Sequence, residues 1–300
     1  MPELPEVHII VTDLKKFLPG LQITDVWTDI PKFKKIKKDV IKEKILKVER
    51  RGKNILIGLT GGKTILVHQK MTGHLLYGKY KRISNSQFSI SKKTKEGNKK
   101  WEAVEPEDLK DPLNRFIHLV FSLSSGKHLA LCDMRKFAKV IIIPTEKISK
   151  EFEKMGPEPF DKNFNFKKFF EIMKNKGGKI KSVLMDQNVI AGIGNIYSDE
   201  ILWLAGIHPT KKTSGLKEAE LKKIYQSIRP ILNKAIGARG SSYIDYRDAQ
   251  GKRGRYQEMQ YAYGLKGQKC KKRGCGGIIE KIVVGSRSAH FCPKHQINYK

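Results

Sequence analysis

The chain has 300 residues, of which 39% are hydrophobic, and its 60 Lys and Arg outnumber 30 Asp and Glu to give a formal net charge of +30. This much apolar sequence can bury sizeable cores, so global disorder is excluded, and the length favours two domains over one. So large a positive charge repels itself and is most simply explained by a polyanionic partner, with a phosphate backbone foremost. A membrane protein is excluded because no apolar run is long enough to span a bilayer, and the acidic start of the chain is unlike a secretory leader.

The first half of the chain predicts one helix followed by β structure. Apolar residues from Val7 to Leu18 recur at helical spacing and stop at Pro19-Gly20, which predicts an amphipathic helix. From residue 21 to about 145, short runs rich in Ile, Val, Leu and Thr alternate with turn residues, predicting an antiparallel β-sandwich. The runs that we expect to be strands include 55–59, 64–68, 117–123 and 140–143. Residues 92–100 are Lys-rich and almost free of apolar side chains, which favours a solvated loop.

The second half predicts a mainly helical domain and a short C-terminal module. Gly156-Pro157-Glu158-Pro159 forbids continued regular structure, helical spacing dominates from Phe164 to Ile236, and turn residues return after Gly240. The expected fold class is therefore α+β. The expected divisions are a β-sandwich domain over 1–150, a helical domain over 157–240, a loop and linker over 241–264, and a hairpin module over 265–300.

The N-terminus itself can carry chemistry. Removal of Met1 would leave Pro2 as a free secondary amine with Glu3 beside it. A terminal amine has a pKa near 7.8 and a lysine near 10.4, so at pH 7 roughly one terminal amine in seven is neutral against about one lysine in 2,500. A secondary amine that attacks a sugar C1′ gives a cationic iminium, which acidifies the neighbouring carbon and promotes β-elimination. Glu3 would move protons if burial raised its pKa. Pro and Glu are also favoured in the first turn of a helix, so the same residues fit a purely structural role.

Three of the four cysteines lie near the C-terminus and suggest a metal site in a reducing compartment. Cys270 and Cys275 form one close pair, and Cys292 with His295 forms a second one after a hairpin-length segment. This arrangement suits one tetrahedral structural zinc, and His290 is the competing fourth ligand. Without a metal, so short a segment lacks the core to fold. The fourth cysteine, Cys132, is expected to be a buried or semi-buried thiol with no role.

The chain resembles the formamidopyrimidine-DNA glycosylases, which are bifunctional enzymes of base-excision repair. The resemblance begins at Met1-Pro2-Glu3-Leu4-Pro5-Glu6-Val7 and keeps the same order to Gln296. Its other carriers are Arg50 to Lys53, His68 to Gly73, Asp133 to Ala138, Lys181 to Gln187, Gly192 to Tyr197, Ala205 to Pro209 and Gly285 to Phe291. The resemblance implies an N-terminal β-sandwich, a helix-two-turns-helix element and a C-terminal zinc hairpin.

The resemblance also implies an activity and the residues that serve it. The implied enzyme excises oxidised purines, 8-oxoguanine and formamidopyrimidines, from damaged double-stranded DNA and nicks the abasic strand by β,δ-elimination. The implied catalytic residues are Pro2, Glu3, Lys53 and Arg287, the last on an arginine finger that grips phosphates. Met71, Arg135 and Phe137 match the side chains that fill the space left by the everted nucleotide. The remaining expected DNA contacts are Glu6, His68, Lys136, Lys179, Lys181, Asn195 and Tyr197. The loop from Gly240 towards Tyr263 matches the one that closes over the everted base, and we expect a monomer of bacterial, cytoplasmic type.

Departures from the family pattern leave alternatives open. The first cysteine pair is more widely spaced than usual, and His295 stands where a fourth cysteine is common. Phe116 replaces the first histidine of a K-H-x-H segment and leaves only His118, Lys136 replaces an arginine, and Ala138 replaces a glycine. An endonuclease VIII type acting on oxidised pyrimidines is the sister interpretation, against which Leu4 weighs because that branch usually has Gly there. A non-catalytic DNA-binding protein is the third, and it has no need for Pro2, Glu3 or Lys53.

Overall fold

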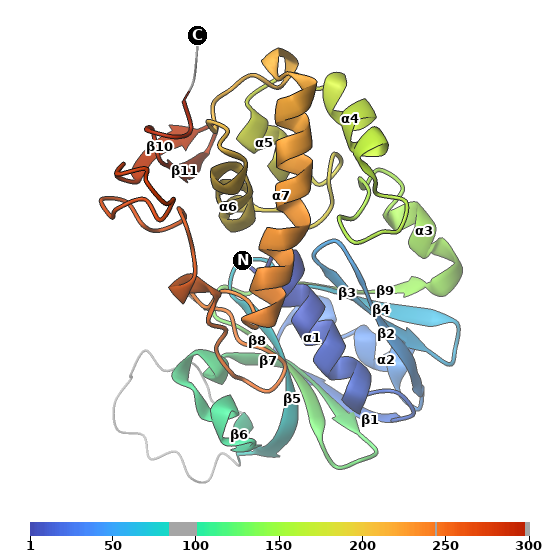
Figure 1. Ribbon diagram of the computed structural model, residues 1–300. Coiled ribbons are helices and arrows are strands. Elements are labelled where there is room, and N and C mark those ends of the chain that lie inside the picture. The colour runs from blue at the N-terminus through green and yellow to red at the C-terminus, as the bar shows by residue number, and fades with distance from the viewer. Residues whose placement is uncertain (84–100, 244, 298–300) are drawn as a thin grey trace. The chain divides into compact units, whose positions relative to one another are not determined.

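The computed structural model describes residues 1–83, 101–243 and 245–297, and the expected loop at 92–100 lies outside them. The chain forms two compact units. The first comprises Met1–Pro2, Glu6–Glu151 and Arg239–Arg255, and the second comprises Glu3–Pro5, Phe152–Ala238 and the chain from Tyr256 onward. Figure 1 shows strands dominating the first unit and helices the second. This is the α+β class that the sequence predicts.

The predicted N-terminal helix is α1, Leu4–Phe17. Val7, Ile10 and Leu14 are buried along one of its faces, at the spacing that brings side chains to the same side of a helix. Lys15 and Lys16 occupy the last turn, where cations are favourable near the carbonyl end. The helix stops before Pro19-Gly20, and Gly20 has a φ of +85°, which reverses the chain without a steric penalty.

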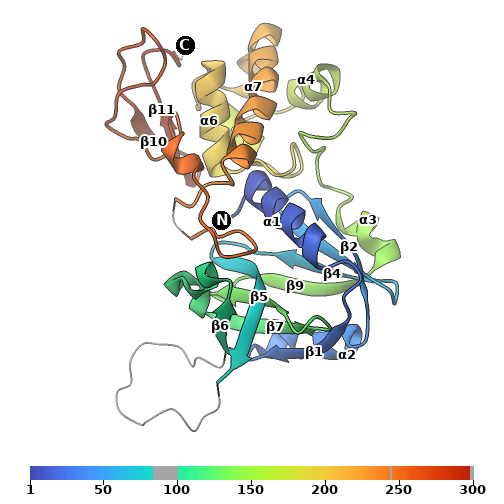
Figure 2. The ribbon, with the colours of Figure 1, turned by 60° about the horizontal axis from the view of Figure 1, so that its bottom comes forward.

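The first unit is the predicted antiparallel sandwich, and Figure 2 shows its two sheets as separate layers. One sheet has four strands in the order β2-β3-β4-β9, and the other has five in the order β1-β7-β8-β5-β6. The strands are β1 Ile23–Thr28, β2 Ile45–Arg51, β3 Asn54–Leu59, β4 Lys63–His68, β5 Gly73–Arg82, β6 Trp101–Glu105, β7 Ile117–Leu123, β8 His128–Asp133 and β9 Lys139–Pro144; two short helices are α2 Ile36–Val40 and α3 Ile148–Glu151. The four predicted strands agree with β3, β4, β7 and β9 to within a residue.

The sandwich core alternates along the strands as period-two geometry requires. Ile55 and Ile57 of β3 and Leu119 and Phe121 of β7 enter one cluster, which the apolar face of α1 completes. Cys132 lies in a second cluster, where its thiol donates to the Asn114 carbonyl at 2.9 Å. Burial raises the pKa of the Cys132 thiol far above its ordinary value, so the thiol stays protonated. The expectation that this cysteine is buried is confirmed.

The second unit packs helices around an apolar core and adds a two-stranded hairpin. Its elements are α4 Phe166–Lys174, α5 Ile180–Met185, α6 Asn195–Ala205, α7 Glu218–Gly237, β10 Glu280–Val284 and β11 Arg287–Phe291. Asn165 caps α4 by accepting from the Lys168 N–H, and Gly206, with a φ of +71°, ends α6. The hairpin lies beside α6 in both ribbon views. The helical domain and the C-terminal hairpin are therefore as the sequence predicts.

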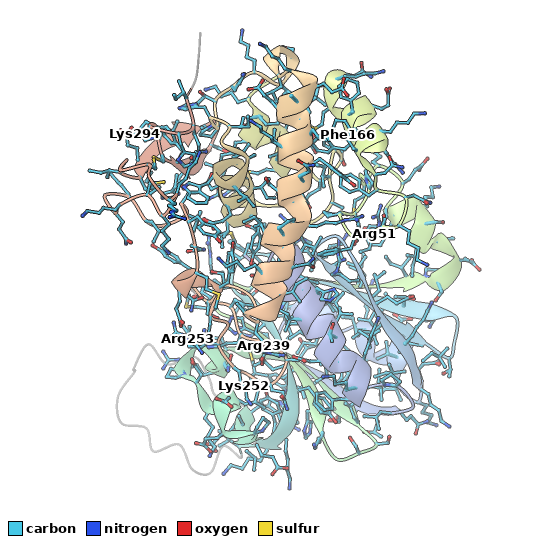
Figure 3. All side chains as sticks on the ribbon, in the orientation of Figure 1. Arg51, Phe166, Arg239, Lys252, Arg253 and Lys294 are labelled. Atoms are coloured by element: carbon cyan, nitrogen blue, oxygen red, sulfur yellow. The ribbon has the colours of Figure 1, made fainter. Side chains whose placement is uncertain are left out.

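The loop expected at 241–264 is divided by the structure at residue 255. Residues 239–255 fold back onto the first unit, where the Tyr77 N–H donates to the Ala249 carbonyl at 2.6 Å. The Arg239 guanidinium donates hydrogen bonds to two carboxylates, those of Asp13 in α1 and of Asp248 in this loop. Figure 3 labels Arg239, Lys252 and Arg253 on this same segment. Sequence reasoning missed the division because the anchoring carboxylate of Asp13 is far away along the chain.

Candidate active site and DNA interface

Glu3 is fixed by the first turn of α6. Its side chain is only 3% exposed, and its carboxylate accepts from the Ile196 N–H at 2.9 Å and the Tyr197 N–H at 3.4 Å. These N–H groups have no partner inside the helix, and the helix dipole favours a negative charge at this end. A Cβ on Gly194 would stand 2.4 Å from the Glu3 carboxyl carbon, so only glycine leaves room for the carboxylate. The residue that follows Pro2 in the chain is thus held at a helix N-terminus.

The Gly192-Ile193-Gly194-Asn195 loop is braced by one side chain. The Gln187 amide donates to the Ile193 carbonyl and accepts from the Gly192 N–H, both at 2.8 Å. The Leu4 N–H donates to the Gly192 carbonyl at 3.0 Å, so the same loop also fixes the start of α1. Asn195 is the first residue of α6 and is half-buried, with its side-chain oxygen enclosed, and it stays a candidate phosphate contact.

Two residues of this unit that were expected to contact DNA have fully buried side chains. Lys181 is 0% exposed, and its ammonium group pairs with the Asp199 carboxylate instead of reaching solvent. Tyr197 is also fully buried, with its ring 5.5 Å from that of Tyr256. Both side chains are enclosed by neighbouring residues and so support the fold. Lys179, at the N-cap of α5, is exposed and stays a candidate phosphate contact.

Glu6 is likewise an internal group, with its side chain buried. Its side chain is buried and accepts from the Ser241 N–H at 2.8 Å, while its carbonyl accepts from the Tyr246 hydroxyl at 3.4 Å. A Cβ on Gly240 would stand 3.0 Å from the Glu6 side chain, and the φ of Gly240 is +80°. Glu6 therefore anchors the start of the 239–255 loop, because a buried carboxylate needs the amide hydrogen that the loop supplies.

Met71, Arg135 and Phe137 are brought to neighbouring loops of the first unit. Met71 is 40% and Phe137 54% exposed, so two large apolar side chains face solvent on these loops. The Arg135 guanidinium lies 4.7 Å from the centre of the Phe137 ring, in a cation–π contact. Exposed apolar side chains beside a cation are suited to entering a base stack. Lys136 is exposed between them, and the Ala138 substitution is harmless because the left-handed backbone falls at Lys136, with a φ of +58°.

The buried carboxylate of Asp133 holds these two loops together. It accepts from the Thr72 hydroxyl, from the Arg135 N–H at 3.2 Å and from the Ala138 N–H at 2.7 Å. Thr72 directly follows Met71, so one side chain fixes the loops that carry all three exposed residues. Lys32, from the turn Pro31–Phe33, also fixes the loop that carries Arg135 and Phe137. Its ammonium group donates to the Lys136 carbonyl at 3.3 Å and to the Ala138 carbonyl at 3.1 Å.

Asp133→Asn is expected to weaken binding to an abasic duplex about 10-fold or more. The asparagine amide presents N–H groups where the carboxylate accepts, which leaves buried donors facing donors at a cost of roughly 1–3 kcal/mol. Titration of a labelled duplex and thermal melting would measure both effects. The control is Asp25→Asn, which changes the same group at an exposed ion pair with Lys37 in the same unit. Equal losses in the two variants would contradict the role of Asp133.

Lys53 and His68 lie together in the first unit. Lys53 follows Gly52 in the turn between β2 and β3. Both of its neighbours are fixed by hydrogen bonds within the turn. The Arg50 side chain donates to the Gly52 carbonyl at 3.0 Å, and the Asn54 side-chain amide donates to the Arg51 carbonyl at 3.0 Å. The side chain of Lys53 is largely buried, which restricts its ammonium group to one region. Burial, with Lys70 and Lys53 nearby, lowers the pKa of His68 to about 4. His68 is therefore neutral at pH 7, and it accepts from the Lys70 N–H through Nδ1 at 3.0 Å, so Nε2 carries the proton and can donate.

The low pKa of His68 predicts a loss of stability in mild acid. Between the ordinary histidine value and about 4, the unfolded chain binds a proton that the folded chain does not, so stability falls as the pH decreases through this interval. We expect His68→Gln to remove on the order of 1 kcal/mol of this pH dependence between pH 7 and pH 5, after allowance for the exposed part of the ring. Urea unfolding at the two pH values would measure it. A pH dependence identical in variant and wild type would contradict the assignment.

The four predicted zinc ligands converge. The ligand atoms of Cys270, Cys275, Cys292 and His295 all lie within 4.8 Å of one another. The Cys275 and Cys292 sulfurs are 3.6 Å apart, and His295 Nδ1 is 3.5 Å from the Cys270 sulfur. These values match the edges of a tetrahedron around zinc, which are roughly 3.5–3.8 Å for sulfur and nitrogen ligands. His295 Nε2 lies 3.1 Å from the Trp203 carbonyl, which fixes the tautomer that leaves Nδ1 free to bind the metal.

His290 is not the fourth ligand. It lies on β11, buried, and its Nδ1 faces the Asp199 carboxylate at 3.1 Å. Arg287 starts the same strand directly after the two-residue turn Gly285-Ser286, and it is exposed. Gly285 has a φ of +62°, as a tight hairpin requires. His118, the surviving histidine of the K-H-x-H segment, is paired with Asp29 at 2.9 Å.

Sequence reasoning missed the buried carboxylates that organise the site. Asp133, Asp199 and Glu200 are each almost fully buried, yet their patterns in the sequence are those of ordinary surface residues. Glu200 accepts from the backbone N–H groups of Tyr261, Ala262 and Tyr263, and so attaches the linker before the hairpin to α6. One signal was available: two adjacent acidic residues interrupt the otherwise apolar helix Asn195–Ala205.

Comparisons with known proteins agree with this architecture. Family models match at residues 1–140 (formamidopyrimidine-DNA glycosylase N-terminal domain), 155–246 (formamidopyrimidine-DNA glycosylase H2TH domain) and 267–294 (zinc finger found in FPG and IleRS). Together they describe a DNA-binding repair protein with a helix-two-turns-helix domain and a zinc finger. The chain belongs to the formamidopyrimidine-DNA glycosylase family, and it is therefore a DNA glycosylase of base-excision repair that carries one structural zinc.

Individual relatives are similar over their whole length. The formamidopyrimidine-DNA glycosylase of Pelotomaculum thermopropionicum is 35% identical over 304 residues, covering 99% of each chain, and that of Streptococcus mutans is 34% identical with the same coverage. The structure of the Lactococcus lactis enzyme in complex with DNA containing an abasic site has a TM-score of 0.82 and 32% identity, covering 99% of this chain and 100% of that one. Within the described ranges, no helix is long and apolar enough to cross a membrane.

Proposed function

We propose that this glycosylase removes oxidised purines, 8-oxoguanine and formamidopyrimidines, from duplex DNA through a Schiff base on Pro2, and then nicks the abasic strand by β,δ-elimination. The observation that carries the proposal is the carboxylate of Glu3, held at the N-terminus of α6 immediately after Pro2. A Lactococcus lactis relative has been crystallised with DNA containing Fapy-dG, which supports a purine lesion as substrate. Leu4, which packs where a Cβ on Gly192 would be 2.6 Å away, also follows the purine-specific pattern.

The proposed chemistry needs an amine, a proton carrier and anchored phosphates. The Pro2 nitrogen attacks C1′ with its lone pair, the bond from C1′ to the base breaks, and the base leaves with a proton. Opening of the sugar ring gives a cationic iminium, and loss of a C2′ proton then expels the 3′ phosphate, followed by the 5′ phosphate. Glu3 is the group placed to exchange these protons. Lys53 and Arg287 remain cationic and hold the phosphates next to the lesion, while Met71, Arg135 and Phe137 fill the vacated stack.

Lesion preference is tested by strand cleavage of matched duplexes. We expect a duplex with 8-oxoguanine opposite cytosine to be cut at least 10-fold faster than one with thymine glycol at the same position. An undamaged duplex of the same sequence is the control for nonspecific nicking. Faster cleavage of thymine glycol would replace the purine assignment by the oxidised-pyrimidine alternative. We further propose that the enzyme acts as a monomer and that it works in the cytoplasm. Gel filtration with and without duplex would check the oligomeric state.

A further inference from the structure

Three consecutive polar residues of α6 are completely enclosed. Ser198, Asp199 and Glu200 have exposed fractions of 0–1%, in a helix whose other buried residues are apolar. Burying charged groups is costly unless every one is paired and hydrogen-bonded. The groups that pair with these three side chains therefore show which segments α6 holds in place.

One oxygen of Asp199 holds the first turn of α6 through Lys181. The Lys181 ammonium group contacts Asp199 Oδ1 and lies 3.3 Å from both the Asn195 carbonyl and the Ser198 hydroxyl. Burial lowers the pKa of Lys181, while Asp199 and, more weakly, Glu3 act in the opposite direction. The Lys181–Asp199 pair thus lies beside the first turn of α6, which contains Asn195 and donates N–H groups to the Glu3 carboxylate.

The other oxygen of Asp199 holds the hairpin. Asp199 Oδ2 accepts from the His290 backbone N–H at 2.8 Å and lies 3.1 Å from His290 Nδ1, which carries the proton because a carboxylate can only accept. His290 pairs with Lys281 in the register that also pairs Arg287 with Val284. A two-stranded hairpin is marginally stable by itself, so the orientation of its strand depends on such attachments. The zinc ligands flank the hairpin, and Asp199 contacts β11 at its fourth residue, three residues after Arg287.

We propose that Asp199 is a positioning residue for catalysis: its single carboxylate fixes the strand that carries Arg287 and the helix turn that carries Asn195 in one frame. A buried ion pair adds little stability compared with apolar residues of similar size, so stability alone does not account for the Lys181–Asp199 pair. The contacts of Asp199 to both segments fit a positioning role instead. The inference rests on the proposed phosphate contact of Arg287. It goes beyond that contact because Asp199 would touch neither DNA nor the reacting atoms.

The test is a double-mutant cycle between Asp199→Asn and Arg287→Ala. A misplacement of about 1 Å can cost up to 100-fold in rate, so we expect Asp199→Asn to slow single-turnover elimination on an abasic duplex by about 10- to 100-fold. The double variant should be no more than about 3-fold slower than the slower single variant. The matched control is Glu200→Gln, the adjacent buried carboxylate, which holds the linker 261–263. The fold-losses in elimination rate caused by Glu200→Gln and by Arg287→Ala should multiply in the double variant, as expected for independent residues.

A second readout distinguishes positioning from stability. Arg287→Ala should reduce the slope of log affinity against log salt by about one, because one phosphate contact is lost. Asp199→Asn should reduce the slope by the same amount while zinc content stays at one per chain. Should Asp199→Asn fail to fold, the charge-neutral pair Lys181→Met with Asp199→Leu replaces it, since no lone buried charge remains.

The outcomes separate the two claims. If Arg287→Ala leaves elimination and the salt slope unchanged, its phosphate contact is wrong and the inference falls with it. If Arg287→Ala acts as expected but its effect multiplies with that of Asp199→Asn, the phosphate contact stands and the positioning role is wrong. If only Asp199→Asn is non-additive with Arg287→Ala, the positioning role of Asp199 is supported. If Glu200→Gln is equally non-additive with Arg287→Ala, that role is overturned.

Discussion

A chain that keeps one extra residue in front of Pro2 is expected to give no borohydride-trapped adduct with an abasic duplex. The extension converts the Pro2 amine into an amide, whose lone pair is delocalised into the carbonyl and cannot attack C1′. The loss should be at least a few hundred-fold, because an ordinary lysine is neutral roughly 360 times less often than a terminal amine at pH 7. Pro2→Gly keeps an amine but loses the ring that fixes the backbone, and we expect its adduct to fall at least 100-fold.

The matched control carries the same extension behind a protease site. Cleavage that restores a free Pro2 should restore the adduct, which shows that the extension acts on the amine and not on folding. Mass mapping of the wild-type adduct should place the sugar on Pro2. An adduct on Lys53, or full adduct formation by the uncleaved extension, would remove Pro2 as the nucleophile.

Cys275→Ser is expected to release the zinc and to reduce affinity for abasic duplex at least 100-fold. Structural zinc contributes roughly 10–16 kcal/mol to folding of such sites, and a hydroxyl cannot replace the thiolate. The hairpin with Arg287 should unfold, while the sandwich, with its separate core, stays folded. Metal analysis, amide exchange of residues 267–297 and duplex titration would measure these effects.

Two control variants define the ligand set. His290→Phe should retain one zinc per chain, because His290 faces Asp199 and not the metal. His295→Cys should also retain it, since a thiolate at this position completes a four-cysteine site. Loss of zinc in His290→Phe, or a wild type that folds its hairpin without metal, would contradict the assignment.

The fold was predictable where local pattern and burial coincide. The helix at Val7 to Leu18 and the strands β3, β4, β7 and β9 were located because their side chains face a core and alternate with the expected period. Strand β2 was not located, because exposed Lys47 and Glu49 dilute its apolar positions. Its place depends on pairing with β3, which is set by the turn at Gly52-Lys53 and not by its own composition.

The metal site could be predicted from the sequence, whereas the surroundings of several expected DNA contacts could not. The metal ligands were found because four residues within a short segment must meet in space. Glu6, Lys181 and Tyr197 were expected to face DNA because family motifs mark a position as essential without saying what it touches. Their actual partners, Ser241, Asp199 and Tyr256, come from distant segments, and only the folded chain brings them together.

The hydrogen bond between Glu3 and Ile196 joins residues 193 positions apart. A ribosome adding about 5–20 residues per second needs roughly 10–40 s between making the two. During that time a nascent chain can fold its sandwich, but its third residue has no helix end to receive it. Incomplete or truncated products therefore leave the Glu3 carboxylate without the helix end that holds it in the full chain.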